Sequence, residues 1–277
     1  MKMRRAAVSA AVLAAGLLAI PAANASAAPS TDATGLASNG TKLTRFDTDR
    51  PDRAYRIGTI SGLSGDTSLV GIDRRVQNGK LYGVGNSGGI YTLSTSSAKA
   101  TKVGQLTIAL SGDSFGVDFN PAANALRIIS NTGQNLRQPF GTTDGPTVAT
   151  VADGGLNYLT VSAPGVVAAA YTNNDLNLET ATSLFDIDST LDQVALQSPA
   201  NSGSLAATGK LGVDVPAEVG FDIFTKLKKG KAVSSKGYIT FFNQGHHMLY
   251  SVDLLTGAAS YEGRQKYSVT DLAVDLW

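Results

Sequence analysis

A short motif recurs along the chain at intervals of about fifty residues, and this repeat constrains the fold more than any other feature. Each copy is an apolar run that ends in Gly-x-Asp or a close variant, and the copies end at Asp73, Asp118, Asp222 and Asp275. These aspartates are separated by 45, 104 and 53 positions, and the midpoint of the long interval, Ala170, lies in the apolar run 165–171. We take that run as a degenerate fifth copy. A repeat of this period predicts a chain built from five similar units.

Each complete unit contains three further β-like segments after its motif. In the first unit an Asn78-Gly79 pair precedes them, and Asn-Gly between alternating apolar segments is a strong hairpin signal because both residues accept positive φ. The pattern predicts a four-stranded antiparallel meander in each unit. The expected segments are 80–84, 90–95 and 101–105; 125–130, 135–140 and 147–152; 182–188, 192–197 and 205–210; and 237–242, 248–254 and 258–263.

The fifth unit is divided between the two ends of the chain. Its motif strand, 268–275, comes last, whereas the segments 35–38, 42–47 and 54–60 have no motif of their own. Pairing the first strand with the last removes two exposed sheet edges at once. We therefore predict an all-β, five-bladed β-propeller over residues 35–277, with four-stranded antiparallel blades and a last blade closed by the N- and C-terminal strands. A β-sandwich or an open β-solenoid is the structural alternative, since the number of strands alone excludes neither.

The first residues have the three-part layout of a secretory signal peptide. A basic start at 1–5 precedes an apolar run at 6–20 and two small-x-small sites that end at Ala25 and Ala27. The apolar run is shorter than the roughly twenty residues that span a bilayer. We expect residues 1–27 to be removed near Ala25 or Ala27, residues 28–34 to form a flexible N-terminus, and the protein to be a secreted monomer with no membrane insertion.

Composition excludes several classes of protein. A hydrophobic fraction of 43% is too high for a disordered chain, and the absence of cysteine removes disulfides and thiolate-bound metals. Beyond residue 27 the chain has 20 basic and 22 acidic residues. This near-neutral balance gives no reason to expect a nucleic-acid partner.

Several stretches of this chain resemble a bacterial exported family known only as a domain of unknown function, number 4394. The clearest are residues 112–121 (GDSFGVDFNP) and 126–137 (LRIISNTGQNLR), and shorter matches lie at 69–73, 81–83, 169–174 and 211–214. The resemblance runs from about Gly35 to the C-terminus. It departs from the family at Ala168, where glycine is more usual, and in the charged turn 226–231. The resemblance implies no activity, because the family carries no assigned reaction, and its members often sit in larger secreted proteins.

The four motif carboxylates form a candidate metal site. If the motif strand is innermost in each blade, Asp73, Asp118, Asp222 and Asp275 end at one level around the channel, and Ala170 breaks the ring. Converging carboxylates repel one another, which raises their pKa values or recruits a hard cation. Ca²⁺ is thus the one candidate cofactor. The alternative is that each Asp accepts backbone N–H bonds in the turn after its own strand.

Two polar loops are candidate binding sites, because amides recognise sugar hydroxyls and peptide backbones, although Asn and Gly also fill turns for conformational reasons. The candidate residues are Arg127, Asn131, Gln134, Asn135, Arg137, Asn173 and Asn174. We name no catalytic residue, because the Gly-x-Ser-x-Gly sequences at Ser87 and Ser114 precede no helix and His246-His247 falls in a turn.

The expected function is a non-catalytic extracellular binding module for a carbohydrate, a peptide or a cell-wall component. One alternative is a Ca²⁺-dependent propeller hydrolase or lactonase, which would also need a buried base that the sequence does not identify. The other is a purely structural scaffold. Fold analogy cannot choose among these, because propellers host both binding and catalysis.

Overall fold

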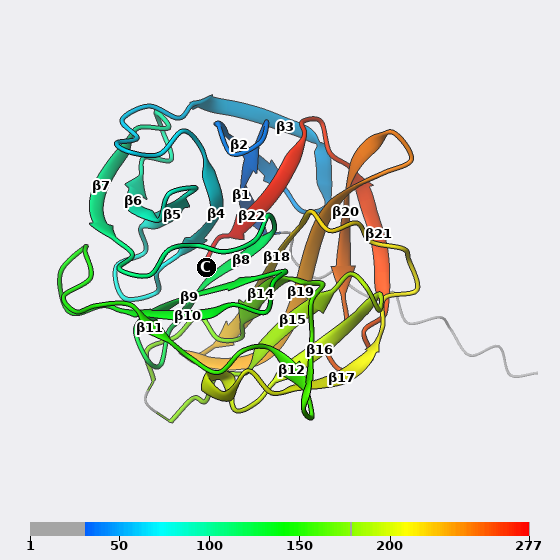
Figure 1. The fold of residues 1–277 in the computed structure, drawn as a ribbon. Coiled ribbons are helices and arrows are strands. Elements are labelled where there is room, and N and C mark those ends of the chain that lie inside the picture. The colour runs from blue at the N-terminus through cyan, green and yellow to red at the C-terminus, as the bar shows by residue number, and fades with distance from the viewer. Residues whose placement is uncertain (1–30, 178, 277) are drawn as a thin grey trace, which may run out of the picture.

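The computed structural model describes residues 31–177 and 179–276, which form a ring of five four-stranded antiparallel sheets (Figure 1). The predicted terminal closure is present. The C-terminal strand β22 (Val269–Val274) pairs with β1 (Asp32–Ala37), so that Ala33 lies opposite Val274 and Gly35 opposite Leu272. Strands β2 (Lys42–Asp47) and β3 (Arg50–Thr59) complete this blade. The chain is therefore a five-bladed β-propeller closed by its own two ends.

The other four blades are consecutive meanders, and each begins with its innermost strand. The first contains β4 (Leu69–Arg74), β5 (Leu81–Gly85), β6 (Gly89–Leu93) and β7 (Ala100–Gln105). The second contains β8 (Phe115–Asn120), β9 (Ala125–Ser130), β10 (Asn135–Pro139) and β11 (Val151–Ala152). The third contains β14 (Val166–Tyr171), β15 (Leu184–Asp188), β16 (Gln193–Gln197) and β17 (Leu205–Lys210). The fourth contains β18 (Val219–Lys228), β19 (Lys231–Asn243), β20 (His246–Val252) and β21 (Ala259–Arg264).

The hydrophobic core is divided into five clusters, one between each pair of neighbouring blades. The cluster beside the closing blade, for example, joins Leu36 and Leu43 of that blade to Leu81 and Tyr91 of the next. Each sheet therefore buries both of its faces against its neighbours. A ring of this kind has no separate centre of apolar packing, and this leaves the channel free for polar groups.

The glycine of the motif is explained by the close approach of the inner strands. A Cβ built on Gly116 would lie 2.4 Å from the backbone nitrogen of Ala169 in the next blade. A Cβ on Gly220 would lie 2.5 Å from the Cα of Asp271. Both distances are shorter than a carbon contact allows. The repeat is therefore a packing requirement of the ring.

The structure differs from the sequence-based prediction at several boundaries. Strand β1 begins at Asp32, inside the segment 28–34 that we expected to be flexible, because Ala33 and Thr34 are buried and pair with strands on both sides. Residues 28–30 and the predicted signal peptide, 1–27, lie outside the described residues. The expected strand 147–152 is reduced to the two residues of β11.

The structure contains a short hairpin, a 3₁₀ turn and a long hairpin extension that were not predicted. A short hairpin, β12 (Asn157–Tyr158) and β13 (Val161–Ser162), precedes β14, and a single 3₁₀ turn, η1 (Ala200–Ser202), precedes β17. Strands β18 and β19 form a hairpin much longer than its counterparts in the other blades. Within residues 31–177 and 179–276, no helix has the length and apolarity needed to cross a bilayer.

Candidate functional site

Three motif carboxylates meet at the centre of the ring. Asp73 on β4, Asp118 on β8 and Asp222 on β18 are buried, and one oxygen of each lies within 4.8 Å of one oxygen of the other two. The structure thus brings together three of the four aspartates that the sequence placed in one cluster.

Each of these carboxylates accepts a hydrogen bond from a neighbouring blade. The N–H of Phe119 donates to Asp73 Oδ2 (2.7 Å), that of Tyr171 to Asp118 Oδ1 (3.0 Å), and that of Val274 to Asp222 Oδ2 (2.6 Å). The alternative drawn from the sequence placed these bonds in the turn after each aspartate's own strand. The donors of these three bonds belong to the next inner strand, so the carboxylates connect one blade to the next. Asp73 and Asp222 each accept, in addition, the N–H of the residue that directly follows them.

Asp275 does not join the cluster, and this corrects the sequence-based assignment. The N–H that binds Asp222 belongs to Val274, just as the N–H that binds Asp73 belongs to the residue after Asp118. The position equivalent to Asp118 in the last strand is therefore Ala273, and Asp275 lies one pleat further on. Its carboxylate pairs with Arg74 (2.8 Å) and with Arg45.

Asp271 is a further, partly buried carboxylate that the sequence analysis missed. It stands where β4, β8 and β18 carry the motif glycine, and its Oδ2 accepts the N–H of Ile72 (2.8 Å). The segment predicted as the last strand, 268–275, carries acidic residues at both 271 and 275, so the repeat alone allowed two alignments. The hydrogen bonds from Val274 to Asp222 and from Ile72 to Asp271 select the alignment in which Asp271 takes the place of the motif glycine.

Burial raises the pKa values of the central carboxyl groups. The pKa of Asp222 rises to about 6, mainly because burial disfavours its charged form. Burial raises the pKa values of Asp73 and Asp118 well above the usual range, and repulsion from the neighbouring aspartates adds to the shift. Burial has the same effect on the pKa of Asp271. The cluster therefore favours bound protons over a full set of negative charges.

The central site fits a calcium ion poorly. Carboxylate oxygens are suitable ligands, but Ca²⁺ takes about six to eight oxygens. Both oxygens of Asp73 and of Asp222 already accept backbone N–H groups. Arg74 lines the same cavity, whose volume of about 10 Å³ is close to that of one water probe. In so small a space the positive charge of Arg74 would repel a divalent cation.

The polar side chains of the first candidate region, 127–137, form hydrogen bonds within the protein. Arg127 is 2% exposed and donates to the side chains of Tyr171, Asn135, Asp153 and Asn201 at 2.7–3.2 Å. These bonds connect β9 to four separate segments of chain.

The other candidates in this region also have structural partners. Arg137 pairs with Asp153, and Asn135 donates to the carbonyl oxygens of Gly154 and Ala200. Asn131 accepts the N–H of Asp113 (3.0 Å), and Gln134 contacts Ser111 and Ala109. The side chains in this loop thus hold turns together.

Asn173 and Asn174 lie at the mouth of the central cavity. Both are buried, and Asn173 has a φ of 87°, a conformation that Asn tolerates better than most residues. The N–H of Asn173 donates to Thr225 Oγ1 (2.9 Å), and Asn174 Nδ2 donates to the carbonyl oxygen of Leu276 (3.1 Å). These two candidates alone of the polar-loop set lie next to the carboxylates.

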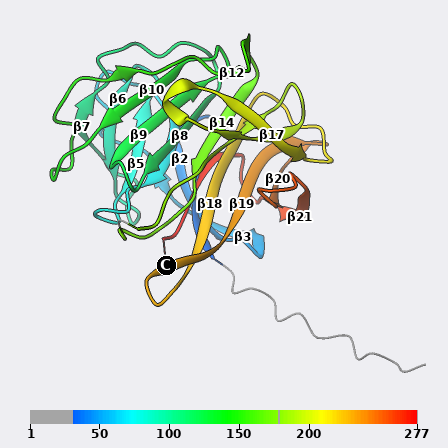
Figure 2. The same cartoon turned by 90° about the horizontal axis from the view of Figure 1, so that it is seen from below.

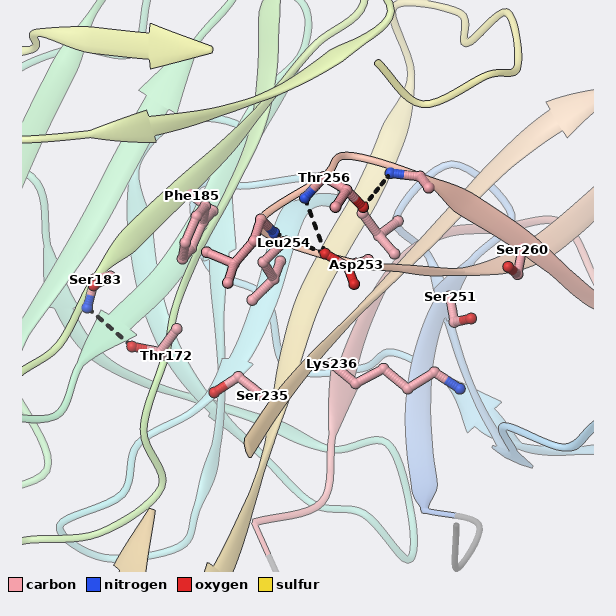
Figure 3. Close-up of a pocket in the computed structure, with 13 residues that line it drawn as sticks. Thr172, Ser183, Phe185, Ser235, Lys236, Ser251, Asp253, Leu254, Thr256 and Ser260 are labelled. Carbon is pink, nitrogen blue, oxygen red and sulfur yellow. Dashed lines mark hydrogen bonds between the residues drawn. The ribbon is translucent and has the colours of Figure 1, made fainter. Parts of the chain in front are cut away.

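A larger pocket lies between the blade β14–β17 and the blade β18–β21 (Figure 3). Its volume is about 720 Å³, within the range typical of small-molecule sites. The sequence carries no signal of this pocket, because its walls come from separate segments that share no motif. The lining residues are Thr172, Ser183, Phe185, Ser235, Lys236, Ser251, Val252, Asp253, Leu254, Leu255, Thr256, Ala258 and Ser260.

The pocket combines hydroxyl groups with an apolar wall. Figure 3 shows Phe185 and Leu254 on one side, and Ser251 and Ser260 on the other. The turn above them is held by Asp253, whose Oδ1 accepts the N–H groups of Leu255 (3.0 Å) and Thr256 (2.9 Å). The pocket is therefore built on a fixed turn.

Both charged side chains of this pocket have partners of their own. Lys236 Nζ lies 2.9 Å from Glu262, and although burial opposes it, this hydrogen bond raises the pKa of the lysine. The other titratable side chain of the lining, Asp253, has a pKa lowered by the backbone N–H groups of its turn. The lysine is therefore held protonated by Glu262, and the carboxylate of Asp253 is held ionised by its own turn.

The chain belongs to the family described as "Domain of unknown function (DUF4394)", whose model matches residues 42–273. The resemblance seen in the sequence is thus confirmed over most of the chain. A search of curated proteins gave no match.

Solved structures support the propeller fold. A protein of unknown function from Bacteroides thetaiotaomicron is 15% identical with a TM-score of 0.50, over 86% of this chain and 62% of that one. Auxiliary nutrient binding proteins from Bacteroides ovatus and Bacteroides thetaiotaomicron have TM-scores of 0.47 and 0.44 at 13% and 11% identity, and cover 74% and 82% of this chain. This chain spans 52% and 55% of the length of those two proteins. At these identities the likeness concerns the fold alone.

Proposed function

We propose that this member of the DUF4394 family is an exported, non-catalytic propeller that binds a carbohydrate in the pocket between its last two consecutive blades. The observation that carries the proposal is the lining of that pocket, in which serine and threonine hydroxyls face an apolar wall. A sugar ring presents hydroxyl groups around its edge and C–H groups on its faces, so it matches both surfaces. Such pockets orient ligands with a few polar groups on a mainly apolar surface.

The electrostatics of the pocket favour an uncharged ligand. Lys236 is neutralised by Glu262, and the carboxylate of Asp253 is hydrogen-bonded within its own turn. Hydroxyl groups can donate and accept, so they bind ligand hydroxyls of either orientation. Peptides and other cell-wall components are the ligands that the sequence also left open, and charged ones match this lining less well.

Export is supported by residues 1–27, whose basic, apolar and small-x-small parts have the order of a signal peptide. A propeller free of cysteine also suits an oxidising compartment. Mass spectrometry of the secreted protein would test this, because export predicts a new N-terminus near residue 26 or 28.

A ligand screen by thermal shift and calorimetry tests the binding proposal. The probes are oligosaccharides of glucose, galactose, xylose and N-acetylglucosamine, together with alanine- and glycine-rich tripeptides. We expect at least one oligosaccharide to raise the melting temperature. The filled-pocket variants Ser235→Trp and Ser260→Trp should lose this binding while keeping the fold. Ser87→Trp, in an exposed turn of another blade, is the matched control.

Three results would overturn the proposal. The first is that no oligosaccharide binds. The second is that the filled-pocket variants bind as tightly as the control, which would place the site elsewhere. The third is that only the peptides bind.

A further inference from the structure

The hairpin of β18 and β19 projects from the ring. The other inner strands, β4, β8, β14 and β22, have six residues each, whereas β18 has ten and β19 has thirteen. Strand β18 continues six residues past Asp222, a reach of about 20 Å at the usual rise of a strand. Figure 2 shows this hairpin extending beyond the ends of its neighbours. Most of the added residues are exposed, so the extension adds little to the core.

The tip of this hairpin concentrates positive charge. Lys226, Lys228, Lys229 and Lys231 are all exposed, and they are four of the chain's 23 basic residues within six positions. In the part of the chain that the structure describes, their one ion pair joins Lys231 to Glu179 at 3.9 Å, and both side chains are exposed. The other nearby carboxylate, Asp175, is buried and accepts the N–H of Ala232 (3.2 Å).

The lysines stand at positions that local structure disfavours. Lys228 lies directly opposite Lys231 across the hairpin, and like charges in that relationship repel. Between them, Lys229 (φ 52°) and Gly230 (φ 72°) both have positive φ, as in a type I′ turn, where Asn, Asp or Gly is preferred in the first position. Departures from local preference of this kind are typical of functional segments.

Exposed apolar side chains accompany these charges. Val233, in the irregular part of β19, is 54% exposed, and Leu176, next to the Asp175 that binds the hairpin, is 56% exposed. A projecting element with clustered lysines and exposed aliphatic groups suits the interface of a bilayer, where cations meet headgroups and apolar groups meet acyl chains.

We propose that the β18–β19 hairpin docks the protein reversibly on a bilayer with anionic headgroups. The near-neutral net charge of the chain does not reveal this site, because acidic residues elsewhere balance the local cluster of lysines. The attachment is peripheral, and each lysine contributes about fivefold to the partition coefficient at low salt. The proposal is independent of the ligand pocket.

Vesicle co-sedimentation tests the proposal. The purified protein is mixed with vesicles of phosphatidylglycerol and phosphatidylcholine, or of phosphatidylcholine alone. We expect binding to the anionic vesicles only, with loss of binding in 0.5 M NaCl, roughly the salt at which screening shortens to a few ångströms. Replacing Lys226, Lys228, Lys229 and Lys231 with Gln should weaken binding at least tenfold.

The matched control replaces four exposed lysines elsewhere, Lys99, Lys102, Lys210 and Lys266, with Gln, which changes the net charge equally. This control should bind as the unaltered protein does, and both variants should keep its melting temperature within a few degrees. Equal binding by the two variants would overturn the proposal, as would no binding to anionic vesicles. Binding to soluble polyphosphate without binding to vesicles would also overturn it and identify a polymer as the partner.

Discussion

Arg74 on the innermost strand of one blade lies 2.8 Å from the carboxylate of Asp275, which follows the last strand of the chain. Asp275 also pairs with Arg45 on β2, so that one carboxylate connects the C-terminal segment to the closing blade and to the blade beside it. The three side chains are partly buried, which reduces solvent screening of the pairs. The closure of the ring thus has an electrostatic component in addition to the pairing of β22 with β1.

Asp275→Asn should destabilise the protein by about 1–2 kcal/mol, because it leaves Arg74 without its ion-pair partner and removes one of the two carboxylates that pair with Arg45. Urea denaturation measures the change in the free energy of unfolding. The control is Asp32→Asn, since Asp32 contacts the same Arg45 but is 55% exposed. Equal losses in the two variants would contradict a special role for Asp275.

Gly116→Ala should cost several kcal/mol, because the added methyl group would overlap the backbone of Ala169 and force two inner strands apart. Thermal unfolding with circular dichroism detects the loss as a lower melting temperature. Gly155→Ala is the control, as its nearest neighbour would lie at an acceptable 3.4 Å. A tolerated Gly116→Ala would mean that the motif glycine is not a packing requirement.

The sequence predicted the architecture well because the packing of the inner strands imposes the repeat directly on it. The same repeat predicted the meeting of Asp73, Asp118 and Asp222. It misplaced Asp275, because Asp271 and Asp275 permit two alignments of the last copy. Only two hydrogen bonds distinguish these alignments, one donated by Val274 to Asp222 and one donated by Ile72 to Asp271. Sequence reasoning could not find the pocket, because Thr172, Ser235 and Ser260 approach one another only through the arrangement of two blades. Isolated hydroxyl residues carry no signal of this kind.

The stability of the protein should decrease as the pH rises from about 4 through about 6. The folded protein holds the pKa of Asp222 at about 6 against an ordinary 3.8, so it binds more protons than the unfolded chain over this interval. Each pKa unit corresponds to about 1.4 kcal/mol. The raised pKa values of Asp73, Asp118 and Asp271 act in the same direction. Melting temperatures measured between pH 4 and pH 8 test this.

The matched variant for the pH experiment is Asp118→Asn. Its amide oxygen can still accept the N–H of Tyr171, but it carries no charge. We expect this variant to be more stable than the unaltered protein at pH 7.5 and to show a flatter dependence on pH. A melting temperature that instead rises steadily with pH would show that the ionised cluster is the stabilising form.

Calcium should give no heat of binding and no change in melting temperature when it is added to chelator-treated protein at pH 7.5. The reason is the donor set: the oxygens of Asp73 and Asp222 already accept backbone N–H groups, and Arg74 lines the same cavity. Isothermal titration calorimetry and thermal shift measure the two quantities, with Asp118→Asn as the comparison. If calcium stabilised the unaltered protein but not this variant, an ion would occupy the cluster, and the calcium-dependent hydrolase would become the function to test next.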